Sequence, residues 1–129
     1  MTTGEMEDAK PQSGVDRIER LRRDLRRFAA DRNWEQFHTP KNLAIALSVE
    51  AGELLEHFQW LTAEQSEKLS GSPLVQVRQE LADVFLYLLS LSDRLGVDLL
   101  VAAFEKIELN AKKYPVELAK GSAKKYTEL

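Results

Sequence analysis

The sequence predicts an all-α protein, an antiparallel four-helix bundle that assembles into an oligomer. Apolar residues recur at three- and four-residue steps along most of the chain, which is typical of amphipathic helices. One of these stretches is apolar on nearly every side, so it needs cover from several neighbours. At 129 residues, the chain is long enough for one domain with a real core and too short for two.

Composition narrows the classes of protein to consider. The 43% hydrophobic fraction supports a folded chain, and the absence of cysteine excludes thiolate zinc sites, iron–sulfur clusters, cysteine nucleophiles and disulfide scaffolds. A cysteine-free chain also fits a cytoplasmic location. The formal net charge of −3 argues against a nucleic-acid polymer as partner. No run approaches the roughly 20 apolar residues that span a bilayer, so we expect no membrane association.

We expect three segments along the chain. Residues 1–15 are rich in small, polar and acidic residues and predict a disordered N-terminal tail. Residues 16–116 hold the periodic stretches and predict one helical domain. Residues 117–129 predict a polar C-terminal tail, with Leu118 and Tyr126 as its sizeable apolar side chains.

The first periodic stretch, residues 16–31, predicts an amphipathic helix whose six arginines form a solvated face. The next segment, NWEQFHTP at residues 33–40, breaks the helical period, and Pro40 biases the residue before it away from helical geometry. We therefore expect a loop here. Its aromatic residues Trp34 and Phe37 fit two uses, a plug at the end of the bundle or a surface that stacks against a flat ligand such as a nucleobase.

The organising feature of the sequence is a set of four acids placed where helices usually carry leucine. Glu50 and Glu53, in a helix predicted from Lys41 to Trp60, lie about 60° apart on an apolar face. Glu80 and Asp83 repeat this arrangement in a helix predicted from Leu74 to Leu95. Burying four acids together costs roughly several kcal/mol each unless a cation or a proton neutralises them. We therefore predict a bound divalent metal.

Oxygen-only ligands favour a hard cation, Mg²⁺ or Mn²⁺, over zinc or copper. A di-iron helical bundle is the alternative kind of metal site, but it uses Glu-x-x-His pairs from two helices. Each acid pair here instead has a second carboxylate three residues after the first. Di-iron chemistry therefore ranks below magnesium. His57 lies one turn after Glu53 and fits a satisfied core histidine better than a metal ligand.

After Glu80, the helix that ends near Leu95 has no polar face. Such a helix is central in a bundle or covered by another subunit. Because a chain of this length has few elements to surround it, we expect a homo-oligomer, either a dimer or a dimer-of-dimers tetramer.

The last long helix is expected from Leu99 to Tyr114, after Gly96 ends the previous helix and Asp98 caps this one. Its Lys106, Asn110 and Lys113 fall within about 60° of each other. A column of two ammonium groups and an amide suits phosphate oxygens, although a lysine row is more often a solvated face.

Glu50-x-x-Glu53 followed by Glu80-x-x-Asp83 resembles the metal signature of the MazG-like all-α nucleotide pyrophosphohydrolases. The surroundings strengthen the resemblance, and they are similar to the dCTP pyrophosphatase branch of this superfamily. The matching stretches are NWEQFH at residues 33–38, PKNLA at 40–44, EAGEL at 50–54, FQW at 58–60, KYP at 113–115 and KYTEL at 125–129.

The resemblance implies Mg²⁺-dependent hydrolysis of a nucleoside triphosphate, dCTP or a modified dCTP, to the monophosphate and diphosphate, in the clearing of nucleotide pools. The implied metal ligands and catalytic residues are Glu50, Glu53, Glu80 and Asp83. The implied substrate contacts are Lys106, Asn110 and Lys113 to the phosphates, with Tyr87 and Tyr114 close by, and Trp34, His38 and Trp60 to the base and sugar.

Two other interpretations stay open. The same machinery could act on dUTP, on non-standard triphosphates or on phosphoribosyl-ATP, because pocket shape decides the substrate. Alternatively, the chain could be a non-catalytic helical interaction module in which the acids hold a structural cation.

Overall fold

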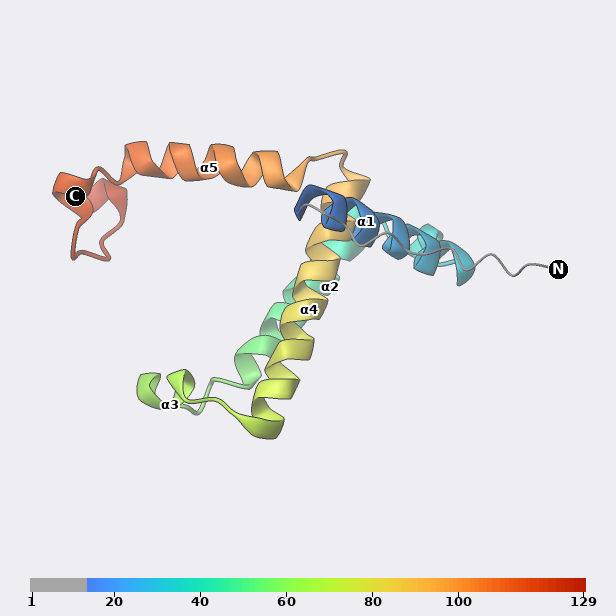
Figure 1. Ribbon diagram of the computed structural model, residues 1–129, viewed down its shortest axis with the longest axis horizontal. Helices are drawn as coiled ribbons and strands as arrows, with labels where there is room; N and C mark the ends of the chain where they lie inside the picture. The colour runs from blue at the N-terminus through green and yellow to red at the C-terminus, as the bar shows by residue number, and fades with distance from the viewer. Residues whose placement is uncertain (1–13) are drawn as a thin grey trace. The chain divides into compact units, whose positions relative to one another are not determined.

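The computed structural model describes residues 14–129, and within this range the chain is helical without strands (Figure 1). The all-α prediction is confirmed, with four long helices. They are α1 (Gly14–Asp31), α2 (Pro40–Glu56), α4 (Gly71–Arg94) and α5 (Leu99–Lys113). The short elements are α3 (Ala63–Glu67), α6 (Val116–Ala119) and the 3₁₀ turns η1 (Glu35–Phe37) and η2 (Tyr126–Glu128).

The helices divide between two compact units, one ending at Leu95 and the other spanning Gly96–Leu129. Most of the tail expected at residues 1–15 lies outside the described residues, but Gly14 and Val15 already belong to α1. No helix in residues 14–129 is both long and apolar enough to cross a bilayer.

The boundaries of α2 follow from its capping residues. The Thr39 hydroxyl accepts a hydrogen bond from the Asn42 backbone N–H at 3.2 Å, and Pro40 takes the first helical position, where no N–H partner is needed. The helix ends at Glu56, four residues before the expected end. From there the N–H of His57 bonds back three residues to the Leu54 carbonyl at 3.3 Å, so the chain leaves the α-helical pattern. Trp60 therefore lies in a turn and not on the helix.

The start of α4 also differs from the expectation of a helix from Leu74. Gly71 and Pro73 form the first turn of α4 and do not lie in the loop before it. Gly71 has φ +62°, a left-handed conformation that glycine adopts at little cost, so the chain can turn sharply there. Pro73 is tolerated because the first N–H groups of a helix have no partner within it.

The core of the first unit lies where α2 and α4 run antiparallel, side by side (Figure 1). Leu43 of α2 and Leu89 of α4 are fully buried, with 1% and 0% exposure, and Val77 of α4 is also buried. α1 packs against α4 and contributes the buried Ala29. This contact joins α1 to the C-terminal part of α4, where Arg26 donates a hydrogen bond to Asp93.

The second unit is built around α5. The Asp98 carboxylate caps this helix by accepting a hydrogen bond from the Val101 N–H at 3.1 Å, as expected, after Gly96 turns the chain with φ +66°. At its other end, the rings of Tyr114 and Tyr126 meet edge to face at 6.2 Å. The segment expected as a C-terminal tail thus contains α6 and η2, and η2 contacts the end of α5.

Because Leu43 is 1% exposed in the α2–α4 core, we expect Leu43→Ala to lower the free energy of unfolding by about 2–5 kcal/mol through lost burial and a residual cavity. Chemical denaturation followed by circular dichroism measures this loss. Lys41→Ala, at an exposed position on the same helix, is the control and should change stability by less than about 0.5 kcal/mol. Equal losses in the two variants would contradict this packing.

Candidate functional site

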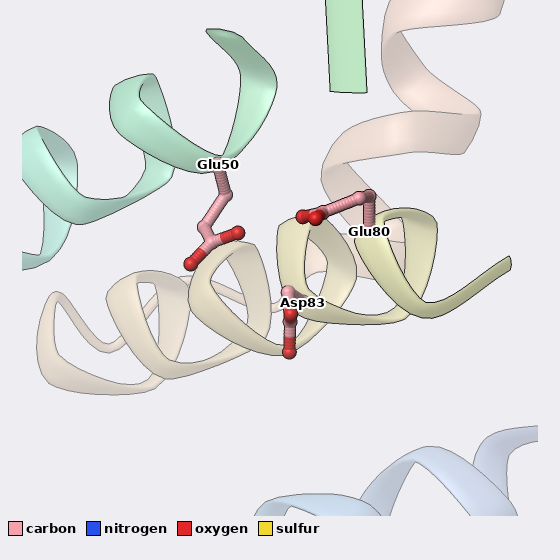
Figure 2. A group of neighbouring side chains, drawn as sticks. All are labelled: Glu50, Glu80 and Asp83. Atoms are coloured by element: carbon pink, nitrogen blue, oxygen red, sulfur yellow. The ribbon is translucent and has the colours of Figure 1, made fainter. Parts of the chain in front are cut away.

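Three of the four predicted acids converge between α2 and α4. Glu50 extends from α2 towards α4, which carries Glu80 and Asp83 (Figure 2). One carboxylate oxygen from each residue lies within 4.8 Å of the other two. The geometry follows from the sequence, since antiparallel packing places the acid-bearing faces of the two helices against each other and a three-residue spacing keeps Glu80 and Asp83 on one face.

The acids differ in exposure. Glu50 and Glu80 are half-buried, but Asp83 is exposed, whereas the sequence predicts that all four point into the apolar stripe. Asp83 lies about 60° around α4 from Glu80, enough to leave the seam between the helices. Glu53 is half-buried on α2 and is not one of the three converging acids, although it interacts with Glu50.

Two buried carboxylate oxygens of this cluster lack a hydrogen-bond donor among the described residues. Glu50 Oε2 and Glu80 Oε2 are buried without a hydrogen-bond partner among the residues that the structure describes. An ionised carboxylate can only accept, so each buried oxygen requires a donor or a cation to offset its lost hydration. His57 does not satisfy them, because its Nε2 lies 3.8 Å from Glu80 Oε1, beyond hydrogen-bond distance.

The pKa of Glu50 shows the same cost of burying close carboxylates. Burial raises the pKa of Glu50 to about 7, and the close approach of the Glu53 and Glu80 carboxyl groups contributes to the rise, as does repulsion from Glu53 and Asp83. Glu53 therefore belongs to the cluster electrostatically. A group of close carboxylates with unpaired buried oxygens and no nitrogen or sulfur ligand fits a hard divalent cation.

A cavity of about 330 Å³ opens beside the acids within the first unit. It brings three of the predicted substrate residues, Trp34, His38 and Tyr87, together with Glu50 and Asp83. The remaining lining residues are Leu25, Phe28, Ala29, Leu86 and Ser90. An apolar and aromatic pocket with a few polar groups at one side is typical of small-molecule sites.

The loop after α1 sets the aromatic wall of this cavity. Asn33 adopts φ +54°, and the Trp34 N–H donates to the Ala29 carbonyl at 2.9 Å, so the chain folds back on the end of α1. The Trp34 ring then meets Phe28 edge to face at 5.7 Å and His38 at 6.2 Å. The wall is thus tied to α1 by the backbone and by ring contacts.

Several lining residues of the cavity are not predicted by the sequence. Phe28 belongs to the apolar stripe of α1, and nothing local marks it as a pocket residue. Leu86 and Ser90 carry a usable signal, since they follow Asp83 by three and seven residues and so share its helical face.

The other predicted site residues lie elsewhere. Trp60 is 86% exposed and does not line this cavity. Lys106, Asn110 and Lys113 are exposed on α5 in the second unit, where Lys113 Nζ lies 5.0 Å from the centre of the Tyr126 ring. Tyr114 is half-buried at the end of this helix. The roles expected for these residues stay predictions.

The raised pKa of Glu50 predicts how stability depends on pH in a chelating buffer. Its folded-state pKa, about 7, exceeds the ordinary value of 4.5, so the native state holds the proton more tightly than the unfolded state. The stabilising contribution is fully present below pH 4.5 and is lost as pH rises through about 7. We expect Glu50→Gln to flatten this part of the pH–melting temperature curve. A curve identical to that of the wild type would contradict the assignment.

Comparison with known proteins places the chain in a family. The model of the MazG-like family matches residues 45–129. Human dCTP pyrophosphatase 1 is 46% identical over 114 residues, which cover 87% of this chain and 67% of the relative. The Bos taurus protein of the same name is also 46% identical over 114 residues, which cover 87% of this chain and 68% of that relative. The crystal structure of a pyrophosphatase from Archaeoglobus fulgidus superposes with a TM-score of 0.73 at 40% identity, covering 77% of this chain and 93% of that one. The chain belongs to the MazG-like family.

Proposed function

We propose that the chain is a nucleotide pyrophosphohydrolase that cleaves dCTP, or a modified dCTP, into the monophosphate and diphosphate and so clears such nucleotides from the pool. The observation that carries this proposal is the cluster of unpaired acids beside a cavity with an aromatic wall. The relatives named dCTP pyrophosphatase 1 support the same substrate class. A cytoplasmic location is part of the proposal and fits a cysteine-free chain.

In this proposal Glu50, Glu53, Glu80 and Asp83 hold Mg²⁺, for which Mn²⁺ can substitute. When bound, the cation supplies charge neutralisation at the phosphates and a more acidic water. The donor set fits this use, because the buried oxygens of Glu50 and Glu80 have no partner among residues 14–129. The acids would also orient the attacking water towards the α-phosphorus.

The remaining residues of the proposed site position the substrate. Trp34 offers a ring face or edge to the base, while His38 and Tyr87 bring polar atoms to the same cavity. Trp60 also contacts the base in this proposal. Lys106, Asn110 and Lys113, with Tyr114 nearby, bind the phosphate chain. Phosphoryl transfer needs positioning and charge neutralisation more than a covalent catalyst, so these groups suffice for the chemistry.

The direct test is pyrophosphate release from dCTP, 5-methyl-dCTP, dUTP and dTTP, each with and without Mg²⁺. We expect release that requires the cation, with the highest kcat/KM for dCTP or 5-methyl-dCTP. A preference for dUTP, or activity on phosphoribosyl-ATP alone, would shift the substrate assignment to another pyrophosphohydrolase activity. No release from any nucleotide would favour a non-catalytic interaction module with a structural cation.

We expect Asp83→Asn to lower kcat/KM for the best substrate by about a hundredfold or more, since it removes a charged ligand from the acid cluster. Because the Asp83 side chain is exposed, the variant should fold as the wild type does, which circular dichroism verifies. Glu56→Gln, at an exposed acid of α2, is the matched control and should retain activity. Activity of Asp83→Asn near that of the wild type would remove Asp83 from the site.

We also propose that the chain forms a homo-oligomer, either a dimer or a dimer-of-dimers tetramer. α4 presents a stripe of exposed apolar residues, Leu74, Leu81 and Phe85, which lie within about 40° of each other on one helical face. The exposed fractions of Leu74 and Leu81 are 47% and 53%. Apolar stripes of this kind normally mark surfaces that another chain covers.

Because Leu81 lies in the middle of this stripe, we expect Leu81→Lys to convert the assembly to a smaller species in sedimentation velocity experiments. Gln79→Lys adds the same charge about 160° away on α4 and should leave the sedimentation coefficient unchanged. An assembly that tolerates Leu81→Lys would exclude this face as the interface.

A further inference from the structure

A second cavity, of about 460 Å³, adjoins the proposed nucleoside pocket. The two cavities share four lining residues, Leu25, Ala29, His38 and Ser90. The second cavity is charged, and its charged lining residues are Arg22, Arg26, Glu35, Asp93 and Arg94. The proposed mechanism uses none of these five side chains, so their arrangement requires its own explanation.

The centre of this charged group is an ion pair that joins α1 to α4. Arg26 Nε donates to Asp93 Oδ2 at 2.7 Å, and Arg26 Nη2 donates to Oδ1 of the same carboxylate. Arg22 Nε lies 3.7 Å from Asp93 Oδ1 and adds a second positive charge. The forked pairing fixes both the distance and the orientation of the two helices at this point.

The carboxylate of this pair is more buried than the arginine that binds it. The Asp93 side chain is 18% exposed, whereas that of Arg26 is 60% exposed. The hydrogen bonds from Arg26 lower the pKa of Asp93 in spite of its burial. Without Arg26, the largely buried Asp93 carboxylate would lose its two hydrogen bonds and keep only the nearby charges of Arg22 and Arg94, so loss of Arg26 should let α1 shift on α4.

The apolar side chains of α1 are only partly buried. Ala29 is buried, but Leu21 and Phe28 are 36% and 47% exposed. The C-terminal end of α1 continues into the aromatic wall, because Trp34 bonds to the Ala29 carbonyl and packs on Phe28. A shift of α1 therefore moves the wall relative to the part of α4 that carries the acids and Tyr87.

We propose that Arg26 and Asp93 are a positioning pair for nucleoside binding. The pair holds α1 on α4 and thereby sets the distance of Trp34 and His38 from Tyr87, which lines the same cavity from α4. This role rests on the proposed function of the pocket, but the geometry of the pair does not. It differs from a purely structural salt bridge because its loss weakens substrate binding more than it slows the chemical step.

Kinetics test this role with Arg26→Gln, Asp93→Asn and the double variant. For the best deoxynucleotide we expect KM to rise about fivefold in each, with kcat within about twofold of the wild type, because the contacts that are lost form equally in the ground and transition states. The double variant should be no worse than either single variant, since the two side chains act as one unit. Arg27→Gln, at an exposed arginine of the same helix, is the matched control and should leave KM unchanged.

An unchanged KM, or a loss confined to kcat, would overturn the proposal. It would also be overturned if the effects of the two substitutions add fully, or if Arg27→Gln raises KM as much as Arg26→Gln. If Asp93→Asn fails to fold, the result for Arg26→Gln decides, because the Arg26 side chain is 60% exposed and its replacement leaves no cavity in the core. Arg26→Lys keeps the charge and should recover part of the affinity.

A fluorescence measurement separates this proposal from the proposed activity. The sequence holds two tryptophans, so Trp60→Phe leaves Trp34 as the sole reporter. In that background, we expect Arg26→Gln to increase quenching of Trp34 by acrylamide, and Arg27→Gln to have no effect. Unchanged quenching would contradict the positioning role. A wild-type protein that releases no pyrophosphate would instead contradict the proposed activity.

Discussion

The repulsion between close carboxylates is the constraint on which the rest of the structure depends. Glu50 and Glu80 take positions on α2 and α4 that apolar side chains would fill in an ordinary bundle, and each has a buried oxygen without a hydrogen-bond partner in residues 14–129. The raised pKa of Glu50 records the same cost. A cation or a proton must offset this cost, because the acids stabilise nothing by themselves.

The surrounding structure is organised to present this cluster. The buried leucines hold α2 and α4 together, so that acids from two separate helices face one another. α1 then covers one side of α4 and supplies an aromatic wall, which leaves a cavity next to Glu50 and Asp83. The acids and the aromatic rings thus line the same cavity.

The sequence predicted the features that depend on local periodicity. Helical class, the cap at Asp98, and the placement of Glu80 and Asp83 on one face of a helix follow from spacing along single helices. Features that depend on tertiary contacts were not predictable in this way. The Arg26–Asp93 pair joins residues 67 positions apart, and nothing in the spacing of the six arginines of the first helix distinguishes Arg26 from a solvated neighbour.

Anomalous diffraction from crystals soaked in Mn²⁺ tests most directly whether the acids hold a hard cation. Data collected at the manganese absorption edge should show a peak among the carboxylate oxygens of Glu50, Glu80 and Asp83, the three residues that already approach one another within 4.8 Å. The peak should disappear in crystals of the Asp83→Asn variant or weaken strongly. An empty cluster in the wild type, at a Mn²⁺ concentration that supports turnover, would contradict the central claim.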